Sequence, residues 1–435
     1  MSFEIPFSHI AEIIMGQSPK GEEVNNEGIG LPLLNGPTEF TDRYPAPVQH
    51  TAYAKKISLP GDILFCVRGS TTGRMNYSDQ KYCIGRGLAA IRGRNGYPTP
   101  YVKAVLETYL PKLLAAATGS TFPNVSKDLI NNIPVSVLPV ENACNISKLI
   151  ELQEEKVFTN NQINQTLEQM AQALFKSWFV NFEPVKAKMA VLEAGGSQED
   201  AMLAAMTAIS GKDDDALVVF EREHPEQYAE LKATAELFPS AMQDSELGNI
   251  PVTWELGKLQ DLLVLQRGFD LPSSARKDGE FPLIAASGPN GTHNVAIAKA
   301  PGVITGRSGV LGKVYLTLED YWPLNTTLWV KEFKRATPCY AYELLRLLDM
   351  KAFNAGSAVP SLNRNHIHSL SYPLPPMALV NLFESSALLL HQRAHVNLKH
   401  SQSLALLRDT FLPKLLSGEI TLPEAEQAVS EAENV

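Results

Sequence analysis

The sequence has few cysteines, and their spacing does not suit a disulfide framework or a metal site. Cys66, Cys83, Cys144 and Cys339 are scattered, with no C-x-x-C pair and no histidine at ligand spacing. Closely spaced cysteines are typical of small disulfide-bonded domains and structural zinc sites, so we predict neither and favour a reducing compartment. Long apolar runs are also absent. No segment approaches the ~20 residues of a membrane span, and the N-terminus lacks the basic start of a signal peptide. We therefore expect a cytoplasmic protein.

The motifs that usually mark an enzyme are missing too. There is no G-x-G-x-x-G after a predicted strand, no H-E-x-x-H, no G-x-S-x-G and no Asn-Pro-Pro-Tyr type tetrapeptide of amino-methyltransferases. The segment from Gly306 resembles a phosphate-binding loop, but five residues separate Gly306 from Gly312, and Val314 replaces the Ser or Thr that would hold Mg²⁺. His366 and His368 would share one face of an extended strand, where a solvated pair is commoner than a metal site. We expect a non-catalytic chain that binds no metal and no cofactor of its own.

Glycine and proline are absent from residues 147–182, so nothing there forces a helix to end. Apolar residues recur at three- or four-residue steps on one helical face, which polar Gln153, Asn160 and Asn164 interrupt. A comparable stretch runs from Met377 to Leu416. We predict two long helices, the first roughly 54 Å long, packed as an antiparallel coiled coil, although an apolar stripe is usually ordinary core. The residues expected to pack the helices or partner subunits are Leu149, Ile163, Leu167, Met170, Leu174, Phe175, Trp178, Leu390, Leu404, Leu407 and Phe411.

Each predicted helix follows a block rich in glycine, proline and β-branched residues, and the two blocks resemble each other. The pattern G-S-x-x-P at 119–123 recurs at 356–360, an offset of 237 residues. Arg68 corresponds to Arg307 at an offset of 239, and Phe175 to Phe411 at 236. Several anchors at nearly one offset indicate a duplicated half. Within the first copy we predict strands at 63–67, 88–91 and 129–138 and a helix at 101–117, and within the second a helix at 340–350.

The pattern predicts an α/β (α+β) protein with two domains of similar fold, related by pseudo-symmetry and separated by the two long helices. The segments between the blocks and after the second helix are acidic, and the connector is most simply a solvated linker containing short helices. The predicted boundaries are a first block at 1–145, a long helix at 146–182, a connector at 183–247, a second block at 248–376, a long helix at 377–418 and an acidic tail at 419–435.

The net charge of −9 is distributed unevenly along the chain. Residues 1–140 carry 13 basic and 11 acidic side chains, and residues 247–376 carry 13 and 10, so both blocks are net positive. Residues 141–246 carry 8 basic and 19 acidic side chains. Because the negative charge lies in the helical parts, both blocks remain free to meet phosphate.

Glycine-rich loops in both blocks carry residues that suit contact with nucleic acid. Glycine exposes backbone N–H groups to phosphate, and Arg, Asn and Gln can bridge two atoms of one base edge. The alternative, that these are ordinary solvated loop residues, stays open for each of them, as does a stacking role for Tyr77 and Phe122. The predicted DNA-binding residues are Arg68, Ser70, Thr71, Thr72, Arg74 and Arg86 in the first block, and Arg276, Lys277, Asn290, Arg307, Ser308, Lys313 and Arg364 in the second.

Several fragments together resemble the specificity subunits of type I restriction–modification systems (HsdS) over nearly the whole chain. They are GDIL with RGS at 61–70, G-S-x-x-P at 119–123 and 356–360, ALFKSWFVNFEP at 173–184 and LPKLLSGEI at 412–420. The second block departs from the first where 302–305 replaces 61–64, which loses Asp62.

The resemblance implies two target recognition domains that each read one half of a split DNA site. It also implies a helical spacer that carries two modification subunits, and restriction subunits that join the complex. S-adenosylmethionine, ATP and Mg²⁺ would belong to those partner subunits.

We therefore expect a non-catalytic DNA-recognition subunit that binds a bipartite, asymmetric duplex. A scaffold that binds only protein is the alternative from another class, and the net-positive blocks disfavour it. A self-contained nuclease or methyltransferase is the third possibility, and the missing motifs disfavour it.

Overall fold

The computed structural model describes residues 2–118, 123–353, 361–421, 423–424 and 427. Its contacts divide the chain into two compact units, one of Met1–Ile163 with Asn397–Val435 and one of Asn164–Val396. Each unit holds one block and a segment of both long helices. The described helices are α1 (Thr99–Ala115), α2 (Lys127–Asn132), α3 (Val140–Phe179), α4 (Glu183–Glu193), α5 (Gln198–Ser210), α6 (Asp214–Glu223), α7 (Pro225–Glu236), α8 (Leu259–Leu262), α9 (Pro338–Leu347), α10 (Arg364–His368) and α11 (Met377–Ser417).

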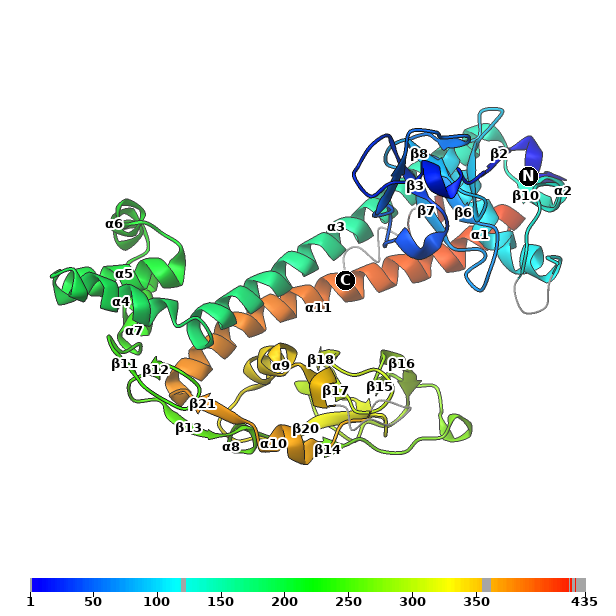
Figure 1. Cartoon of the computed structure of the whole chain (residues 1–435). Helices are drawn as coiled ribbons and strands as arrows, with labels where there is room; N and C mark the ends of the chain where they lie inside the picture. Colours follow the sequence, from blue (N-terminus) through cyan, green and yellow to red (C-terminus); the bar gives the residue numbers. More distant parts are fainter. Residues whose placement is uncertain (1, 119–122, 354–360, 422, 425–426, 428–435) are drawn as a thin grey trace. The chain divides into compact units, whose positions relative to one another are not determined.

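The first block is built from a pair of strands and two sheets whose strands are mostly antiparallel. The sheet orders are β1-β10, β2-β9-β6-β7 and β4-β3-β8-β5, with β3 parallel to β8. Figure 1 shows these strands in blue and cyan, with α1 beside them. The strands are β1 (Phe3–Pro6), β2 (Ala11–Met15), β3 (Leu31–Leu34), β4 (Gln49–Thr51), β5 (Ile57–Ser58), β6 (Ile63–Cys66), β7 (Met75–Tyr77), β8 (Tyr82–Ile84), β9 (Leu88–Gly93) and β10 (Pro134–Val137).

The second block repeats that plan, except that its third sheet has three described strands where the first block has four. Its orders are β13-β21, β14-β20-β17-β18 and β16-β15-β19, with β15 parallel to β19. This confirms the predicted internal repeat. The strands of this part are β11 (Met242–Gln243), β12 (Ile250–Pro251), β13 (Glu255–Lys258), β14 (Leu263–Arg267), β15 (Phe281–Ala285), β16 (Gly288–His293), β17 (Gly302–Gly306), β18 (Val314–Thr317), β19 (Trp322–Pro323), β20 (Thr327–Phe333) and β21 (Ser371–Leu374).

Some local expectations were wrong. Residues 129–138 are not one strand, because the first of them belong to α2 and only Pro134–Val137 is extended. Ser126 caps α2, and its side chain accepts a hydrogen bond from the Leu129 N–H. His366 and His368 lie in the short helix α10, so they do not share a strand face. The G-S-x-x-P motifs at 119–123 and 356–360, with Phe122, fall wholly or largely outside the described residues.

The long helix α3 begins earlier and ends earlier than expected. It starts directly after Pro139, whose carbonyl accepts from the Ala143 N–H at 3.0 Å and so begins the helical hydrogen bonds. It stops at Phe179 because the Asn181 N–H bonds back to the Lys176 carbonyl and Phe182 adopts a left-handed φ of 54°. Packing holds that unusual backbone, since the Phe182 ring lies 5.4 Å from the Trp254 ring and is almost fully buried.

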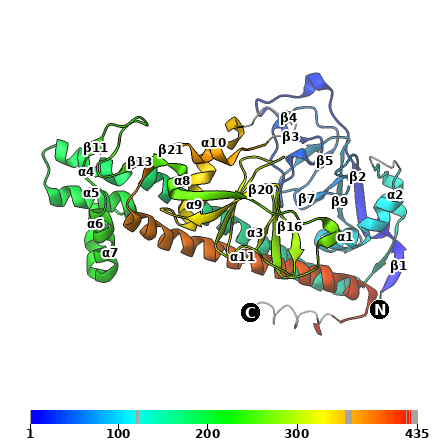
Figure 2. The same ribbon diagram turned by 90° about the horizontal axis from the view of Figure 1, so that it is seen from below.

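In each unit the two long helices pack antiparallel, as Figures 1 and 2 show. In the first unit, Asn160 Nδ2 donates to the Asn397 carbonyl at 3.4 Å and to Ser401 Oγ at 3.1 Å. In the second unit, Asn164 Nδ2 donates to the Ala394 carbonyl at 3.0 Å. Asn160 is buried and Asn164 is partly buried. A shift of one helix along the other would break these hydrogen bonds, so they favour this register.

The expected packing residues divide into two groups. Phe175, Trp178 and Leu404 are buried, and Leu149, Leu167, Leu174, Leu390, Leu407 and Phe411 are partly buried. Ile163 and Met170 are 40% and 52% exposed, so they are not buried between the helices, and their packing against partner subunits stays a prediction.

Burial also corrects the helix register of the repeat. Phe175, Trp178 and Phe179 are buried, as are Leu412, Leu415 and Leu416, each 237 residues on. Phe175 therefore corresponds to Leu412 and not to Phe411.

The connector is more than a solvated linker, since α4 to α7 form a compact helical group (Figure 2). Ala205, Met206, Leu217 and Ala235 make a small core of their own. Lys188 is buried and donates to the carbonyls of Ala235 and Phe238 at 2.7 and 2.6 Å, at the end of α7. Burial lowers the pKa of this amine. Alanine-rich helices approach closely, which gives this acidic segment a fold that composition alone did not predict.

The helix α9 packs in the second unit on an aromatic cluster from both long helices. The Tyr340 ring lies 4.9 Å from Phe179 and 5.1 Å from Phe175, which itself lies 5.5 Å from Phe383. Three residues further along α9, Glu343 is 1% exposed. Burial raises the pKa of its carboxyl to about 7, against the opposing effect of Arg346.

No helix among the described residues is long and apolar enough to cross a membrane.

The first prediction concerns two glycines at equivalent positions. A Cβ on Gly16 would lie 2.2 Å from the Gly85 carbonyl oxygen, and one on Gly268 would lie 2.2 Å from that of Leu324. The carbonyl oxygens are fixed by the backbone and cannot move away from a new Cβ without strain. Gly16→Ala or Gly268→Ala should therefore each lower the free energy of unfolding by about 1–3 kcal/mol. Gly36→Ala is the matched control, since its Cβ would meet nothing within 4 Å and its φ of −169° suits any residue. Urea unfolding measures all three, and equal midpoints would contradict the close approach.

The second prediction is a pH dependence from Glu343. A carboxyl whose pKa is raised on folding binds more protons in the folded state, so its contribution falls as pH rises from about 4.5 to about 7. Glu343→Gln should therefore become more stable relative to the natural chain as pH rises through this window. Exposed Glu332→Gln is the control. Parallel stability curves for all three proteins would refute a buried, protonated Glu343.

Candidate nucleic-acid interface

Three loops of the first block meet at one end of the sheet β2-β9-β6-β7. They follow β2, join β6 to β7 and join β8 to β9. The Gly16 N–H donates to the Leu88 carbonyl at 2.9 Å, and the Val67 N–H to the Gly87 carbonyl at 2.9 Å. Close approach of glycine backbone makes this junction possible, and the loops are therefore rigidly placed relative to one another.

The predicted residues of the first block lie on these loops. Arg68, Ser70, Arg74 and Arg86 are exposed. Arg74 Nη1 lies 3.5 Å from the Pro37 carbonyl oxygen, next to the turn that follows β3. Thr71 and Thr72 are partly exposed, and the Thr72 hydroxyl faces the carbonyls of Gly69 and Pro123 at 2.7 and 2.8 Å. Thr72 closes its own loop, so it positions the arginines and is a weaker candidate for direct contact.

A row of polar side chains that is not predicted from the sequence lies at the same junction. The Arg86 N–H donates to Ser18 Oγ at 3.2 Å, and Ser18 Oγ donates to Asn35 Oδ1 at 3.4 Å. Asn35 Nδ2 then donates to Gln49 Oε1 at 3.3 Å, on the edge strand β4. These residues come from four separated segments with no shared spacing, so only the fold brings them together. The row adds amide groups, which suit adenine edges, to the arginines nearby.

The second block forms the same junction with different chemistry. The Gly268 N–H donates to the Thr327 carbonyl at 3.0 Å, and the Arg307 N–H to the Thr326 carbonyl at 2.8 Å. Arg307 Nε donates to the Asn325 carbonyl at 3.2 Å. Asn325 Nδ2 also donates to Asp270.

Two guanidinium groups converge at this second junction. Arg267 lies 3.6 Å from the Asp270 carboxylate. Burial and then the neighbouring charge of Arg267 lower the pKa of Arg307, while Asp270 opposes them. Two cations around one carboxylate favour an anionic partner. Of these residues, Arg307 is among those predicted from the sequence, whereas Arg267, Asp270 and Asn325 are not.

The backbone hydrogen bonds align the loops of Arg68 and Arg307 differently from the sequence, which matched these two arginines with each other. The Val125 N–H bonds to the Val67 carbonyl, and the Leu362 N–H bonds to the Arg307 carbonyl, both at 2.9 Å. Val67 therefore corresponds to Arg307, and Arg68 to Ser308. The reason is length: the first loop closes with Cys66 N–H on the Arg74 carbonyl, whereas the second closes one residue sooner, with Gly306 N–H on the Lys313 carbonyl.

The remaining predicted residues of the second block form two further groups. Ser308 is partly exposed and Lys313 and Arg364 are exposed, and the bridge between Ser308 and Ser361 brings the start of α10 to the loop of Arg307. Asn290 is exposed on β16, and the Lys277 N–H donates to His293 Nδ1 at 3.1 Å on the same strand. Arg276 Nε donates to the Leu271 carbonyl at 3.4 Å. These contacts place Arg276 beside the loop that carries Asp270, and Lys277 beside β16.

Asp62, which the second block lacks, lies away from the loops. Asp62 is buried before β6, at the opposite end from Arg68, and accepts from the Leu59 N–H and Arg92 Nη2 at 2.8 and 2.7 Å. Burial raises the pKa of this carboxyl. Gly302 leaves room instead for the Tyr321 ring, 2.1 Å from where its Cβ would stand. The difference is therefore one of packing.

The geometry does not support nucleotide or metal chemistry at the positions considered. β18 follows the segment from Gly306, so a hairpin stands where a phosphate-binding loop would lead into a helix. His368 Nε2 accepts from the Leu265 N–H at 2.9 Å, which occupies that ring nitrogen. Among the residues that the structure describes, no group of three or more His, Cys, Asp or Glu is placed to hold a metal ion.

Comparison with known proteins agrees with this architecture. Residues 5–169 match the family model of the type I restriction modification DNA specificity domain. The chain is 28% identical over 408 residues to the type I restriction enzyme HindI specificity subunit of Haemophilus influenzae, covering 84% of this chain and 88% of that one. It is 21% identical over 384 residues to the type I restriction enzyme MjaIX specificity subunit of Methanocaldococcus jannaschii, covering 85% and 80%.

The fold is shared with a solved structure. The S subunit of a type I restriction–modification system from M. genitalium superposes with a TM-score of 0.54 at 14% identity, covering 95% of this chain and 96% of that one. At this identity the likeness concerns the fold, with its two domains and its paired long helices.

Proposed function

We propose that this chain recognises a bipartite DNA sequence through its two blocks. The chain belongs to the family of type I restriction–modification specificity subunits. As a specificity subunit it is the non-catalytic, DNA-recognising component of its complex. In the proposal, the first block (1–145) binds one half of the site and the second block (248–376) the other. S-adenosylmethionine, ATP and Mg²⁺ then act on partner subunits, in the cytoplasm.

The single observation that carries this proposal is the repeated loop junction. Both blocks present the same backbone junction at the end of equivalent sheets, yet its side chains differ: Ser18 and Arg86 in the first, Asp270 and Asn325 in the second. A conserved platform with different polar groups suits two readers of unlike half-sites, since base identity is read by the donor and acceptor pattern of the side chains. The net-positive charge of both blocks supports contact with phosphate.

The long helices supply a surface for two copies of one partner. Leu152 on α3 and Leu389 on α11 are 68% and 67% exposed, and they stand 237 residues apart, at equivalent helix positions. Each is an apolar side chain in solvent, and repetition at the repeat offset suits docking of two modification subunits. Leu406, which is equally exposed, corresponds to Gln169 and so lacks an apolar counterpart.

The third prediction tests DNA contact. In the purified complex with modification subunits, Arg68→Ala or Arg307→Ala should weaken binding to the cognate duplex by roughly tenfold and reduce the salt slope by about 1. Arg222→Ala on α6 is the control, because this exposed arginine lies in the acidic helical group. Fluorescence anisotropy at several salt concentrations measures both quantities. Unchanged affinity and slope for both loop variants would remove these loops from the interface, and a complex without any DNA binding would favour the protein-only scaffold.

The fourth prediction tests partner docking. Leu152→Glu and Leu389→Glu should each reduce the number of modification subunits bound per chain from two to one, because a charge would enter an apolar contact. Leu406→Glu should leave it at two. Native mass spectrometry or light scattering gives the stoichiometry. Full assembly of a Leu152→Glu/Leu389→Glu chain would show that the partner binds elsewhere.

A further inference from the structure

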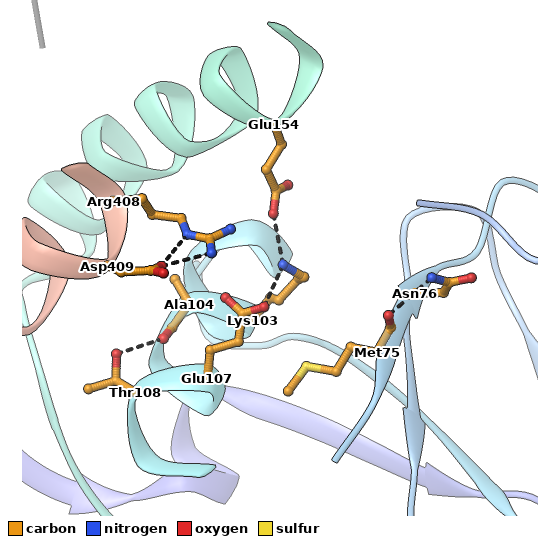
Figure 3. A network of polar contacts seen from close by, with 9 residues as sticks. All are labelled: Met75, Asn76, Lys103, Ala104, Glu107, Thr108, Glu154, Arg408 and Asp409. Atoms are coloured by element: carbon orange, nitrogen blue, oxygen red, sulfur yellow. Dashed lines mark hydrogen bonds and ion pairs between the residues drawn. The ribbon is translucent and has the colours of Figure 1, made fainter. Parts of the chain in front are cut away.

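In the first unit, α1 meets both long helices through a half-buried set of charges, the first charge cluster: Lys103 and Glu107 of α1, Glu154 of α3 and Arg408 of α11. Lys103 Nζ lies 2.8 Å from both Glu107 and Glu154, and only 11% of its side chain is exposed. Figure 3 shows the lysine between the two carboxylates, with the Arg408 guanidinium facing them. The cluster lines a cavity of about 350 Å³.

The charges in this cluster satisfy one another. Burial would lower the pKa of Lys103, but the carboxylates of Glu107 and Glu154 raise it overall. Burial would likewise lower the pKa of Arg408, and Glu107, Asp409 and Glu154 raise it overall. Removing or reversing one charge would therefore leave its partners unpaired in a partly desolvated place.

In the second unit, α9 meets the long helices through different groups, the second charge cluster: Tyr342 and Arg346 of α9, Glu168 of α3 and His391 of α11. Tyr342 Oη donates to Glu168 at 2.7 Å, and Arg346 Nη1 lies 2.9 Å from the same carboxylate. The His391 ring packs edge-on against Tyr342, with centroids 5.4 Å apart.

The repeat places these two clusters at equivalent positions. Tyr101 and Tyr340 are both fully buried at an offset of 239, so Lys103 corresponds to Tyr342 and Glu107 to Arg346. The long helices repeat at 237, the offset of the buried pairs described above. At that offset Glu154 corresponds to His391, Ala171 to Arg408 and Glu168 to Ala405.

We propose that the two charge clusters determine which block helix packs at which position on the long helices. If α9 packed at the first position, Arg346 would face Arg408, and Tyr342 would leave Glu154 without its cation. If α1 packed at the second position, Glu107 would face Glu168 in place of the Arg346 cation, and Lys103 would take the place of Tyr342 between Glu168 and the His391 ring. The shared fold makes both exchanges sterically reasonable, so like-charge repulsion supplies the discrimination. The first position thus accepts a helix with lysine followed four residues later by glutamate, and the second a helix with tyrosine followed by arginine.

The test gives the first block the contact residues of the second within the full-length chain. Lys103→Tyr/Glu107→Arg should speed amide exchange in α1 by more than roughly tenfold, because Arg408 then faces a like charge. Adding Glu154→His, Ala405→Glu and Arg408→Ala, which converts the first position into the second, should restore most of the protection. Lys112→Glu, on the exposed part of α1, is the matched control.

Two results would overturn the proposal. Normal protection of the α1 amides in Lys103→Tyr/Glu107→Arg would mean that charge does not select the helix. If the three added substitutions failed to restore protection, side-chain packing and not charge would select the helix. Should the first variant fail to fold, the pair Glu107→Arg and Arg408→Glu decides. The proposal requires the double variant to unfold at a higher temperature than either single variant, and additive losses would refute it.

Discussion

The packing of one helix from each block against both long helices is the contact on which the molecule depends. In the second unit this contact is aromatic, with Tyr340 set among Phe175, Phe179 and Phe383. In the first unit it adds Lys103 and its carboxylates to an apolar cluster that includes Leu412 and Leu415. Both long helices contribute to each contact, so neither block can pack fully unless the helices pair. Block position, helix register and loop orientation are therefore coupled.

The helix register itself depends on a few buried polar groups. Asn160, Asn397 and Ser401 lie in the first unit almost without solvent exposure, and their hydrogen bonds replace the water they lost on folding. Asn160 contacts Asn397, its own counterpart at the repeat offset of 237. A contact between repeat counterparts is what a pseudo-twofold arrangement of two like helices produces. The amides stabilise less than leucine would in the same place, but they discriminate between registers.

Sequence patterns predicted the parts of this fold that rest on local rules. The absence of glycine and proline from 147–182 predicted α3, and the recurring anchors predicted the repeated strand order. The helix ends were missed because Pro139 and the left-handed Phe182 act through capping and tertiary packing. The connector was underestimated because its small alanine core and buried Lys188 have no distinctive spacing.

The candidate interface was only partly predictable for the same reason. Arg68, Arg74, Arg86 and Arg307 were evident as basic residues in glycine-rich loops. Ser18, Asn35, Gln49, Asp270 and Asn325 meet them only because sheet topology joins loops far apart in the chain. The alignment of the two blocks was also wrong by one residue at Arg68. Residue type matched Arg68 with Arg307, whereas the backbone hydrogen bonds match it with Ser308.

That one-residue difference lies in the length of a hairpin, while the main-chain hydrogen bonds that close the hairpin are the same in both blocks. The hairpins after β6 and β17 differ in length, yet each is closed by the same kind of main-chain hydrogen bond onto the following strand. An insertion or deletion between those closing bonds moves side chains over the surface and leaves the sheet beneath it intact. The sheet can thus carry hairpins of different length and side-chain content without being rebuilt.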